Sequence, residues 1–470
     1  MKTLLRFVAA STASLIAAAC ATTTTTTMPQ PAAQSAPVAR PAASTYTVPV
    51  QYQKLDNGLK VVLSPDHTAP TVAVAVYYGI GFRVEPRNRT GFAHLFEHLM
   101  FQGSQNLGKM QFIKLVQSNG GILNGSTRFD FTNYFEIVPS NTLQTVLWAE
   151  ADRMKGLAIT QDNLTNQQAV VKNEVRVNVL NRPYGGFPWL QMPQKANANW
   201  YNAHNFYGDL TDLDAATLED ARSFFKTYYA PNNAAMAIIG DFEPAQALAW
   251  VRQYFGGIAA QQQPAAADVS EPRQEQEKRA TQTDEKATRP ALAIAYHAPE
   301  HNTPEYFALG LIDQILASGN DSWLYQDLVQ KRGFTDEVES SINSLGNMFS
   351  IKGPTLWTVS LFHDKDKSAE DIVKALDENI ERIRTQPVDA ATLDRARVKM
   401  RSYMYDQIES TFGFGRANLL ASFALFDDDP ARINRIESDF NAVTPELIQK
   451  TAQEYLRPTN RTILTIVPKS

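Results

Sequence analysis

The sequence predicts an α+β protein made of two homologous domains joined by a linker, and three observations support this. Strand-like and helical segments are mixed along both halves of the 470-residue chain. The segment Ala259 to Arg289, rich in Gln, Ala, Pro, Glu and Lys, has little apolar periodicity and is typical of an exposed linker. A Tyr-x-x-Pro-x-Asn pattern that begins at Tyr228 recurs at Tyr455, and an apolar strand-like run follows it both times. This internal echo predicts a duplication.

Composition is that of an ordinary globular protein, with 44% hydrophobic and 20% charged residues. The length exceeds what one core usually holds, which agrees with two large domains. A net charge of −5 provides no basic field, and no Lys/Arg cluster is interleaved with aromatic residues. Nucleic acid is therefore not an expected partner.

Residues 1–20 have the features of a secretory signal: Lys2 and Arg6 precede an apolar run over 7–19 that is too short to span a bilayer. Cys20, the only cysteine, closes the run Ala17-Ala18-Ala19-Cys20, which resembles a bacterial lipobox in which the cysteine is lipidated. Cleavage by an ordinary signal peptidase is the alternative. Without a second cysteine, we expect no intramolecular disulfide.

Residues 21–45 are rich in Thr, Ala and Pro and predict a disordered tether. Such a tether behind a lipidated Cys20 would hold the folded part away from a membrane. We therefore expect an exported bacterial protein of the periplasm. Ala21 resembles the residue that follows the cysteine in lipoproteins sent to the outer membrane.

The first domain, predicted over 46–258, begins with strand-like alternation through Tyr52 to Leu63 and a hairpin turn at Asn57-Gly58. A second strand over 71–79, a helix near 91–101, a strand over 133–138 and helices through 180 follow. The predicted second domain, 290–470, begins with a strand over 291–296 and a helix over 304–317. Apolar runs at 235–239 and 462–467 give the last strand of each domain.

His94, Glu97 and His98 form the pattern H-x-x-E-H. In a helix the two histidines are i and i+4 and share a face, with Glu97 beside them. Two neutral imidazoles can hold Zn²⁺ while the carboxylate takes a proton from water at the metal. The alternative is a surface pair or a satisfied core pair. Apolar neighbours almost all around this helix indicate burial, and a buried Glu between two His residues is costly without a partner.

A catalytic zinc site needs a third protein ligand and an open fourth position. Glu174 is the candidate, because Val170 and Val171 precede it by four and three positions and would place it on an apolar helix face. Taken alone, Glu174 would more readily be read as a carboxylate paired with a nearby Arg. The upstream motif favours the metal.

With these features the chain resembles the pitrilysin/insulinase peptidase family, in particular its bacterial, mitochondrial-processing-peptidase-like branch. Glu174 follows His98 by 76 positions, and the resemblance covers about residues 48 to 468. Further matching segments are Leu55-Asp-Asn-Gly-Leu, Asn181-Arg-Pro-Tyr-Gly, Tyr229-Ala-Pro-Asn-Asn and Ile239-Gly-Asp-Phe.

The resemblance implies two α/β-sandwich-like domains in a clamshell arrangement, each with a mainly antiparallel sheet and packed helices. It implies a zinc metalloendopeptidase acting on peptides or unfolded polypeptides. One Zn²⁺ per chain would be bound by His94, His98 and Glu174, and Glu97 would be the general base.

Two further residues take roles from the resemblance. Gln167 lies seven residues before Glu174 and so on the same helix face. It stands where many members have a Glu that supports the metal ligands through hydrogen bonds. Residues 121–131 resemble the edge at which a substrate peptide adds as a strand, and Asn124 is the side chain expected to touch it.

The second half departs from the family pattern. Active members have an Arg and a Tyr, seven apart, that bind the substrate carbonyl and stabilise the oxyanion. Asp336 stands here where the Tyr is expected and Val329 where the Arg is expected, and Arg332 and Tyr325 occur in reversed order. We therefore expect a heterodimer, in which a homologous subunit supplies the Arg and Tyr. The alternatives are a non-catalytic scaffold with a retained zinc site and a self-sufficient homodimer that uses Arg332 or another cation.

Overall fold

The computed structural model of the chain describes residues 47–469. The predicted signal sequence, Cys20 and the tether lie outside the described residues. Across 47–469, no helix is both long and apolar enough to cross a membrane.

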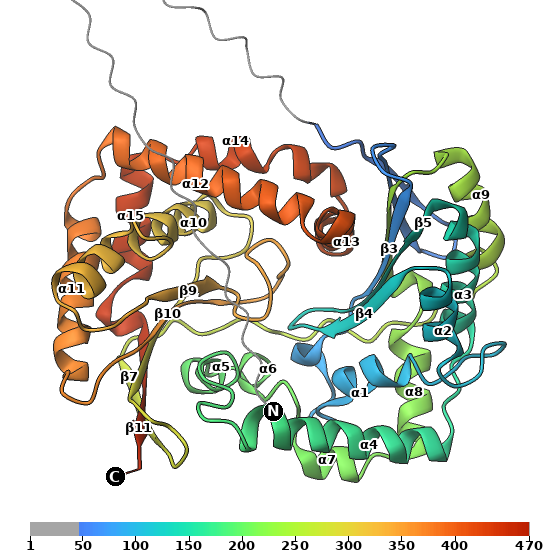
Figure 1. Ribbon diagram of the computed structural model, residues 1–470, viewed down its shortest axis with the longest axis horizontal. Helices are drawn as coiled ribbons and strands as arrows, with labels where there is room; N and C mark the ends of the chain where they lie inside the picture. Colours follow the sequence, from blue (N-terminus) through green and yellow to red (C-terminus); the bar gives the residue numbers. More distant parts are fainter. Residues whose placement is uncertain (1–46, 470) are drawn as a thin grey trace, which may run out of the picture. The chain divides into compact units, whose positions relative to one another are not determined.

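The first of two sheets has six strands in the order β1-β2-β6-β3-β5-β4. Its strands β3, β4 and β5 are labelled in Figure 1. The β2–β6 pair is parallel, and the other neighbouring strands of this sheet are antiparallel. The predicted hairpin at Asn57-Gly58 joins β1 to β2, and Gly58 has a φ of 88° that suits glycine. The strands are β1 (Gln51–Lys54), β2 (Lys60–Pro65), β3 (Thr71–Tyr78), β4 (Ile122–Thr127), β5 (Thr132–Pro139) and β6 (Ala234–Gly240).

The second sheet repeats this plan. Its order is β7-β11-β8-β10-β9, with one parallel pair, β7–β11, followed by antiparallel neighbours. Numbered by their place in each half, its strands follow the same order as β2-β6-β3-β5-β4. The predicted two homologous halves with mainly antiparallel sheets are confirmed. The strands are β7 (Lys278–Asp284), β8 (Ala291–His297), β9 (Glu339–Ile342), β10 (Leu356–Phe362) and β11 (Arg461–Pro468).

The Tyr-x-x-Pro-x-Asn echo has the same structure in both halves. Each copy ends a helix, α8 (Leu218–Tyr228) or α15 (Pro445–Tyr455), and leads through one short turn into β6 or β11. The Nδ2 of Asn233 donates to the carbonyl of Tyr228 at 2.9 Å, and Asn460 donates to Tyr455 at 2.7 Å. The echo is therefore a helix-to-strand connection that both halves close with the same side-chain bond.

Each sheet has one face covered by helices of its own half. For the first sheet this layer packs on Val72, Val74 and Val76, and for the second on Leu292 and Ile294. The covering helices of the first sheet are α1 (Phe92–Leu99), α3 (Leu143–Lys155), α8 and α9 (Pro244–Phe255), and those of the second include α10 (Pro304–Leu316), α11 (Ala369–Thr385) and α15.

The opposite face of each sheet is covered by a helix of the other half. Helix α13 (Phe414–Asp427) packs on β2, β3 and β6, on the side away from α3 and α9 (Figure 1). Helix α5 (Gln191–Ala196) packs on β7, β8 and β11. Alanines such as Ala75 and Ala293 lie on these faces and let the helices approach closely. The two halves therefore share their cores.

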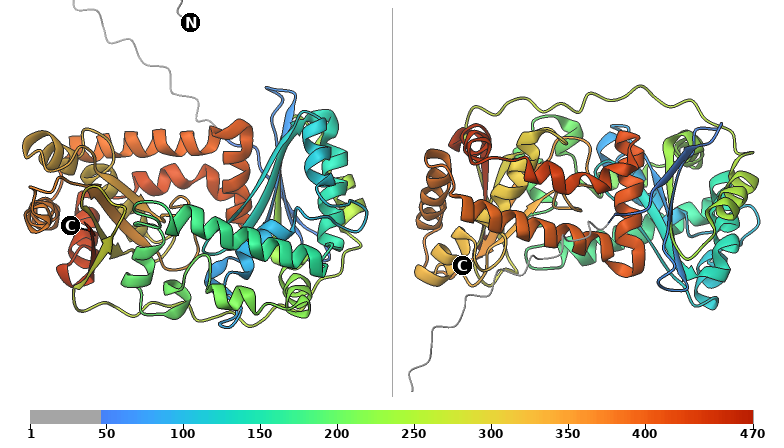
Figure 2. Two further views of the ribbon diagram at one scale, coloured as in Figure 1. Left: turned by 60° about the horizontal axis from the view of Figure 1, so that its bottom comes forward. Right: turned by 90° about the horizontal axis from the view of Figure 1, so that it is seen from above.

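The sequence predicts the linker over 259–289, but about the last third of that range is not linker. It is extended and without regular structure through residue 277 (Figure 2). Residues 278–284 form β7, which pairs in parallel with β11. The sequence Lys-Arg-Ala-Thr-Gln-Thr-Asp is mostly exposed at this sheet edge and has no apolar alternation, so only the partner strand makes it a strand.

A buried ionic cluster lies between β5 and α3. Arg153 pairs with both Glu136 and Glu150, and all three side chains are at most 1% exposed. The guanidinium also stacks over the Phe112 ring at 4.1 Å. Burial and the charge of Glu150 raise the pKa of Glu136 well above its usual value.

Replacing Arg153 by Met is expected to lower the free energy of unfolding by about 3–5 kcal/mol, because two buried carboxylates lose their cation. Urea unfolding followed by circular dichroism measures this. The matched control is Arg279→Met, at an exposed arginine that also has two carboxylate partners, for which we expect a loss below about 1 kcal/mol. Equal losses in the two variants would contradict the expectation.

Candidate metal centre

Helix α1 carries the H-x-x-E-H motif, and its start is fixed by a buried carboxylate. Glu85 accepts hydrogen bonds from the backbone nitrogens of Gly91 at 2.8 Å and Ala93 at 2.5 Å. Gly91 has a φ of 83°, and a Cβ there would lie 2.5 Å from the carbonyl oxygen of Tyr207. The apolar residues of α1 are buried as the sequence predicts. The Glu85 bonds and the close contact at Gly91 therefore fix the residue at which α1 begins.

Helix α4 (Gln161–Val175) brings Glu174 to α1. Thr160 caps its start by accepting a hydrogen bond from the nitrogen of Asn163. Val171 is buried, as expected, but Val170 is 41% exposed, so the apolar face predicted for Glu174 includes only one of its two valines. Glu174 lies at the margin of the buried face, with 28% of its side chain exposed.

The structure brings the three predicted ligands together. The Nε2 of His98 lies 3.3 Å from the Oε2 of Glu174, and the Nε2 of His94 lies 3.7 Å from the same oxygen. One ligand atom from each residue falls within 4.8 Å of the others. Atoms that bind one tetrahedral zinc at about 2.0–2.1 Å lie roughly 3.3–3.5 Å apart, and the two distances to Glu174 are close to that range.

The protonation states of His94 and Glu174 also fit a metal. Burial, together with the charge of His98, lowers the pKa of His94 to about 4, which keeps this imidazole neutral and able to bind. Its Nδ1 is buried without a hydrogen-bond partner among the described residues, so Nε2 provides its polar contact. Although burial acts to raise the pKa of Glu174, hydrogen bonding to His98 lowers it overall, so this carboxyl is ionised. Two imidazoles and one carboxylate match the donor set of a catalytic zinc.

Glu97 lies beside this group and is held by strand β4. The Oγ1 of Thr127 donates to its Oε2 at 2.7 Å. A Cβ at Gly125 would lie 3.2 Å from the Cγ of Glu97, so glycine lets the strand pass close to α1. Burial raises the pKa of Glu97, which favours a role in accepting and returning a proton. Sequence reasoning missed Thr127, because a single Thr thirty positions away from Glu97 belongs to no recognisable pattern.

Tyr207 is a second residue that sequence reasoning missed. Its Oη donates to the Oε1 of Glu174 at 3.2 Å, and its ring packs edge-on against His94 at 5.1 Å between centroids. Burial and the charge of Glu174 raise the pKa of Tyr207 to about 12, so the hydroxyl stays a donor. Tyr207 therefore orients the carboxylate of Glu174.

Tyr207→Phe is expected to weaken zinc binding by about tenfold, because a partner that orients a ligand contributes on that scale. Competition with a chromophoric chelator measures the affinity. Tyr254→Phe, on α9, is the control and should bind zinc as the wild type does. Unchanged affinity in Tyr207→Phe would show that Glu174 does not need this bond.

Of the two residues with supporting roles, Gln167 is buried, and its amide nitrogen donates to Asn166 at 2.8 Å. It also lies near enough to His98 to favour the charged imidazole. Asn124 is exposed on β4, which is the last strand of its sheet. Its Oδ1 accepts from the next backbone nitrogen at 2.9 Å.

Two family models match the chain. One for the insulinase family, peptidase family M16, matches residues 60–183, and one described as the peptidase M16 inactive domain matches residues 215–400. The chain belongs to the insulinase family of peptidases.

Relatives of this insulinase-family chain include the zinc protease PqqE of Helicobacter pylori, which is 25% identical over 431 residues, covering 91% of this chain and 94% of the relative. Among solved structures, a protease from Helicobacter pylori matches with a TM-score of 0.82 and 24% identity over 90% of this chain and all of that one. A peptidase M16 inactive domain from Pseudomonas fluorescens matches with a TM-score of 0.78 and 17% identity, over 90% of this chain and 98% of that one. Both structures share the fold.

In this insulinase-family chain, the second-half residues singled out from the sequence are engaged elsewhere. Arg332 contacts two carboxylates of its own half, Asp327 at 3.0 Å and Glu378 at 2.5 Å. Asp336 pairs with Arg289 at 2.9 Å. The Oη of Tyr325 accepts from Gln330 at 3.3 Å. Arg332 therefore has no free charge to offer an oxyanion.

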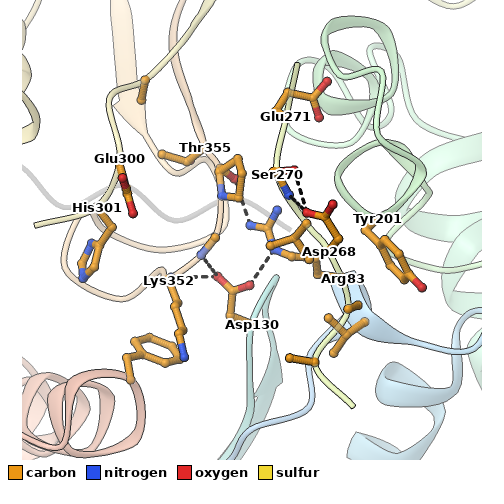
Figure 3. A pocket seen from close by; sticks show the side chains of 18 of the residues that line it. Arg83, Asp130, Tyr201, Asp268, Ser270, Glu271, Glu300, His301, Lys352 and Thr355 are labelled. Carbon is orange, nitrogen blue, oxygen red and sulfur yellow. Dashed lines mark hydrogen bonds and ion pairs between the residues drawn. The ribbon is translucent and has the colours of Figure 1, made fainter. Parts of the chain in front are cut away.

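A cavity of about 1170 Å³ in the insulinase-family chain includes none of the metal residues. It is lined by the 263–273 segment and by both halves (Figure 3). At its wall, Asp130 accepts from Arg83 at 2.5 Å and from the backbone nitrogens of Lys352 and Gly353 at 2.8 and 3.1 Å. These bonds tie the β4–β5 turn to the second half.

Proposed function

We propose that the chain is a zinc-dependent endopeptidase that hydrolyses peptides or unfolded polypeptides, with one Zn²⁺ per chain. The observation that carries this proposal is the convergence of His94, His98 and Glu174 with Glu97 beside them. A closed structural zinc site would need no additional carboxylate, whereas three ligands and a nearby base are the set that metal-assisted hydrolysis requires.

Each residue then has a definite task. Zinc bound by His94, His98 and Glu174 would polarise the scissile carbonyl and acidify the attacking water. Glu97 accepts the proton of that water and delivers it to the leaving amine, for which its raised pKa is suited. Thr127 fixes the Glu97 carboxylate through Oε2 and leaves Oε1 free for the water.

The substrate would bind along β4. This strand has one free edge, and Ile122 at its start is 50% exposed. An extended peptide pairing with that edge would pass Gly125 and Thr127, two β4 residues that lie close to Glu97. Backbone pairing gives affinity with little sequence selectivity, and Asn124 is available to contact the peptide.

We further propose that the working enzyme is a heterodimer. The second half has Val329 and Asp336 at the positions of the expected Arg and Tyr, and Arg332 is held by two carboxylates. A homologous subunit that carries Arg and Tyr but lacks H-x-x-E-H would complete the oxyanion site.

The test compares the zinc-loaded chain alone with the chain mixed with such a homologue, with a quenched fluorescent peptide as substrate. We expect the homologue to raise kcat/KM by about 10²- to 10³-fold, the scale of an oxyanion donor. Adding the homologue to the Glu97→Gln chain is the control and should give no gain. A rate for the chain alone that no homologue changes would refute the heterodimer and favour the self-sufficient homodimer.

A non-catalytic scaffold is the second candidate, and the description of the model that matches residues 215–400 as an inactive domain favours it. It predicts one bound zinc per chain and no hydrolysis with or without the homologue. Metal analysis and the same assay therefore separate the two functions.

For residues 1–45 we propose export, lipidation at Cys20 and anchoring to the outer membrane from the periplasmic side, on the signal-like run that ends at that residue. Metabolic labelling with palmitate followed by membrane fractionation tests this. Cys20→Ser should lose the label and become soluble, and a labelled Cys20→Ser protein would refute the assignment.

A further inference from the structure

Arg128 is a half-buried cation beside the metal centre, and residues 47–469 give it no carboxylate partner. It follows Thr127 at the end of β4, and its Nη1 donates to the carbonyl of Thr127 at 3.0 Å. Among the described residues, no carboxylate oxygen lies within 4.0 Å of its guanidinium. Arg83 and Arg153, which are fully buried, each have a carboxylate in contact. Among the described residues, the guanidinium of Arg128 is thus partly buried without a contacting counterion. Burying an unpaired charge costs free energy.

Strand alternation defines where Arg128 stands. Gly125 and Thr127 face α1 and Glu97. The side chain of Ser126 is on the other face, where it bonds Asn133, which in turn donates to the Oη of Tyr77 at 3.2 Å. Because successive side chains alternate, Arg128 belongs to the face of Ser126. Burial raises the pKa of Tyr77, and the charge of Arg128 opposes that rise, which agrees with a guanidinium on the face of Ser126.

This face of β4 would adjoin a bound substrate. A peptide that pairs with the free edge of β4 directs every second side chain to the Ser126 face, while the intervening side chains point toward α1. Side chains directly opposite one another on paired strands have Cβ atoms about 4.5–5.5 Å apart, within reach of an arginine. This step rests on the proposed peptidase function and on strand pairing at β4.

We propose that Arg128 selects substrates with an Asp or Glu side chain on this face, close to the scissile bond. The planar guanidinium can hold a carboxylate through two parallel hydrogen bonds, which lysine cannot match. An acidic side chain supplies the counterion that the described part of the chain does not provide within 4.0 Å. From the strength of cross-strand ion pairs, we expect a preference of about 2- to 5-fold for Glu over Gln at one substrate position.

The experiment uses peptide pairs that differ only by Glu or Gln at one position, moved stepwise along the peptide. Binding is measured by fluorescence anisotropy on the zinc-loaded full chain with Glu97→Gln, which should hold peptides without cleaving them. Hydrolysis of the same pairs is measured with the otherwise wild-type chain and its homologue. We expect one position with a Glu/Gln ratio of about 2 to 5 in both measurements.

Variants of Arg128 then assign the preference. Arg128→Gln should bring the ratio at that position to one, and Arg128→Glu should reverse it so that Lys is preferred over Gln. Arg128→Lys should keep part of it. Arg252→Gln, at an arginine on α9 that bonds Gln53, is the matched control and should keep the full ratio. Thermal unfolding checks that each variant is folded.

The outcomes separate this inference from the proposed function. A ratio of one at every position of the wild type, a ratio that persists in Arg128→Gln, or no peptide binding at all would overturn the role of Arg128. Hydrolysis without any charge preference would overturn it while leaving the peptidase function intact. A charge preference in binding with no hydrolysis under any condition would instead refute the peptidase function alone.

Discussion

Glu97→Gln is expected to keep its zinc and to lose about 10²- to 10⁴-fold in kcat, the contribution of a positioned general base. The change is nearly isosteric, so Thr127 can still donate to the remaining amide oxygen where it now donates to Oε2. None of the three predicted ligands is altered. Only the capacity to accept a proton is removed, so the loss should appear in kcat while peptide binding and thermal stability stay near wild type.

Zinc content by atomic emission, peptide binding and steady-state hydrolysis together make the measurement for Glu97→Gln. Glu219→Gln is the matched control, since Glu219 is an exposed glutamate on α8 and should leave all three quantities unchanged. Hydrolysis by Glu97→Gln within threefold of the wild type would show that another group takes the proton.

His94→Ala is expected to abolish stoichiometric zinc binding and with it any hydrolysis. The remaining pair, His98 and Glu174, offers two ligands where a catalytic zinc requires three. His94 is also the most buried of the three, with 4% of its side chain exposed. Water therefore has little access to take the place of its Nε2 as a zinc ligand. Zinc per chain after dialysis should fall from one to below about 0.1, and hydrolysis should not return when moderate zinc is added.

The control for His94→Ala is His67→Ala. His67 is an exposed histidine that pairs with Asp241 at 2.7 Å, outside the metal centre. That variant should retain one zinc per chain. Retention of a full equivalent of zinc by His94→Ala would mean that the metal is held elsewhere, and the assignment of the three ligands would be wrong.

The parts that the sequence predicts well depend on local or periodic signals. The hairpin at Asn57-Gly58, the apolar helix of the motif and the echo at Tyr228 and Tyr455 each specify their own conformation. The echo predicts the duplication, and the repeated order of strands agrees with it. These features need no knowledge of distant partners.

The parts that the sequence does not predict depend on tertiary partners. Strand β7 is polar and exposed, and only its pairing with β11 makes it a strand. Thr127 and Tyr207 act on Glu97 and Glu174 from thirty or more positions away, and neither has a spacing that would single it out. Val170 is exposed although it precedes Glu174 by one helical turn, because α4 buries the side with Val171.

Helix α13 of the second half covers the first sheet, and helix α5 of the first half covers the second sheet. An isologous dimer has the same symmetry, because each copy packs an equivalent element against the other. A single-domain ancestor could have formed this contact between two separate molecules, and gene fusion would then have made it internal. During synthesis the first sheet emerges with one alanine-rich face bare, and it stays bare until residues 414–427 follow. Completion of the fold must therefore wait for nearly the whole chain, and a protein truncated after its metal residues would be prone to aggregate.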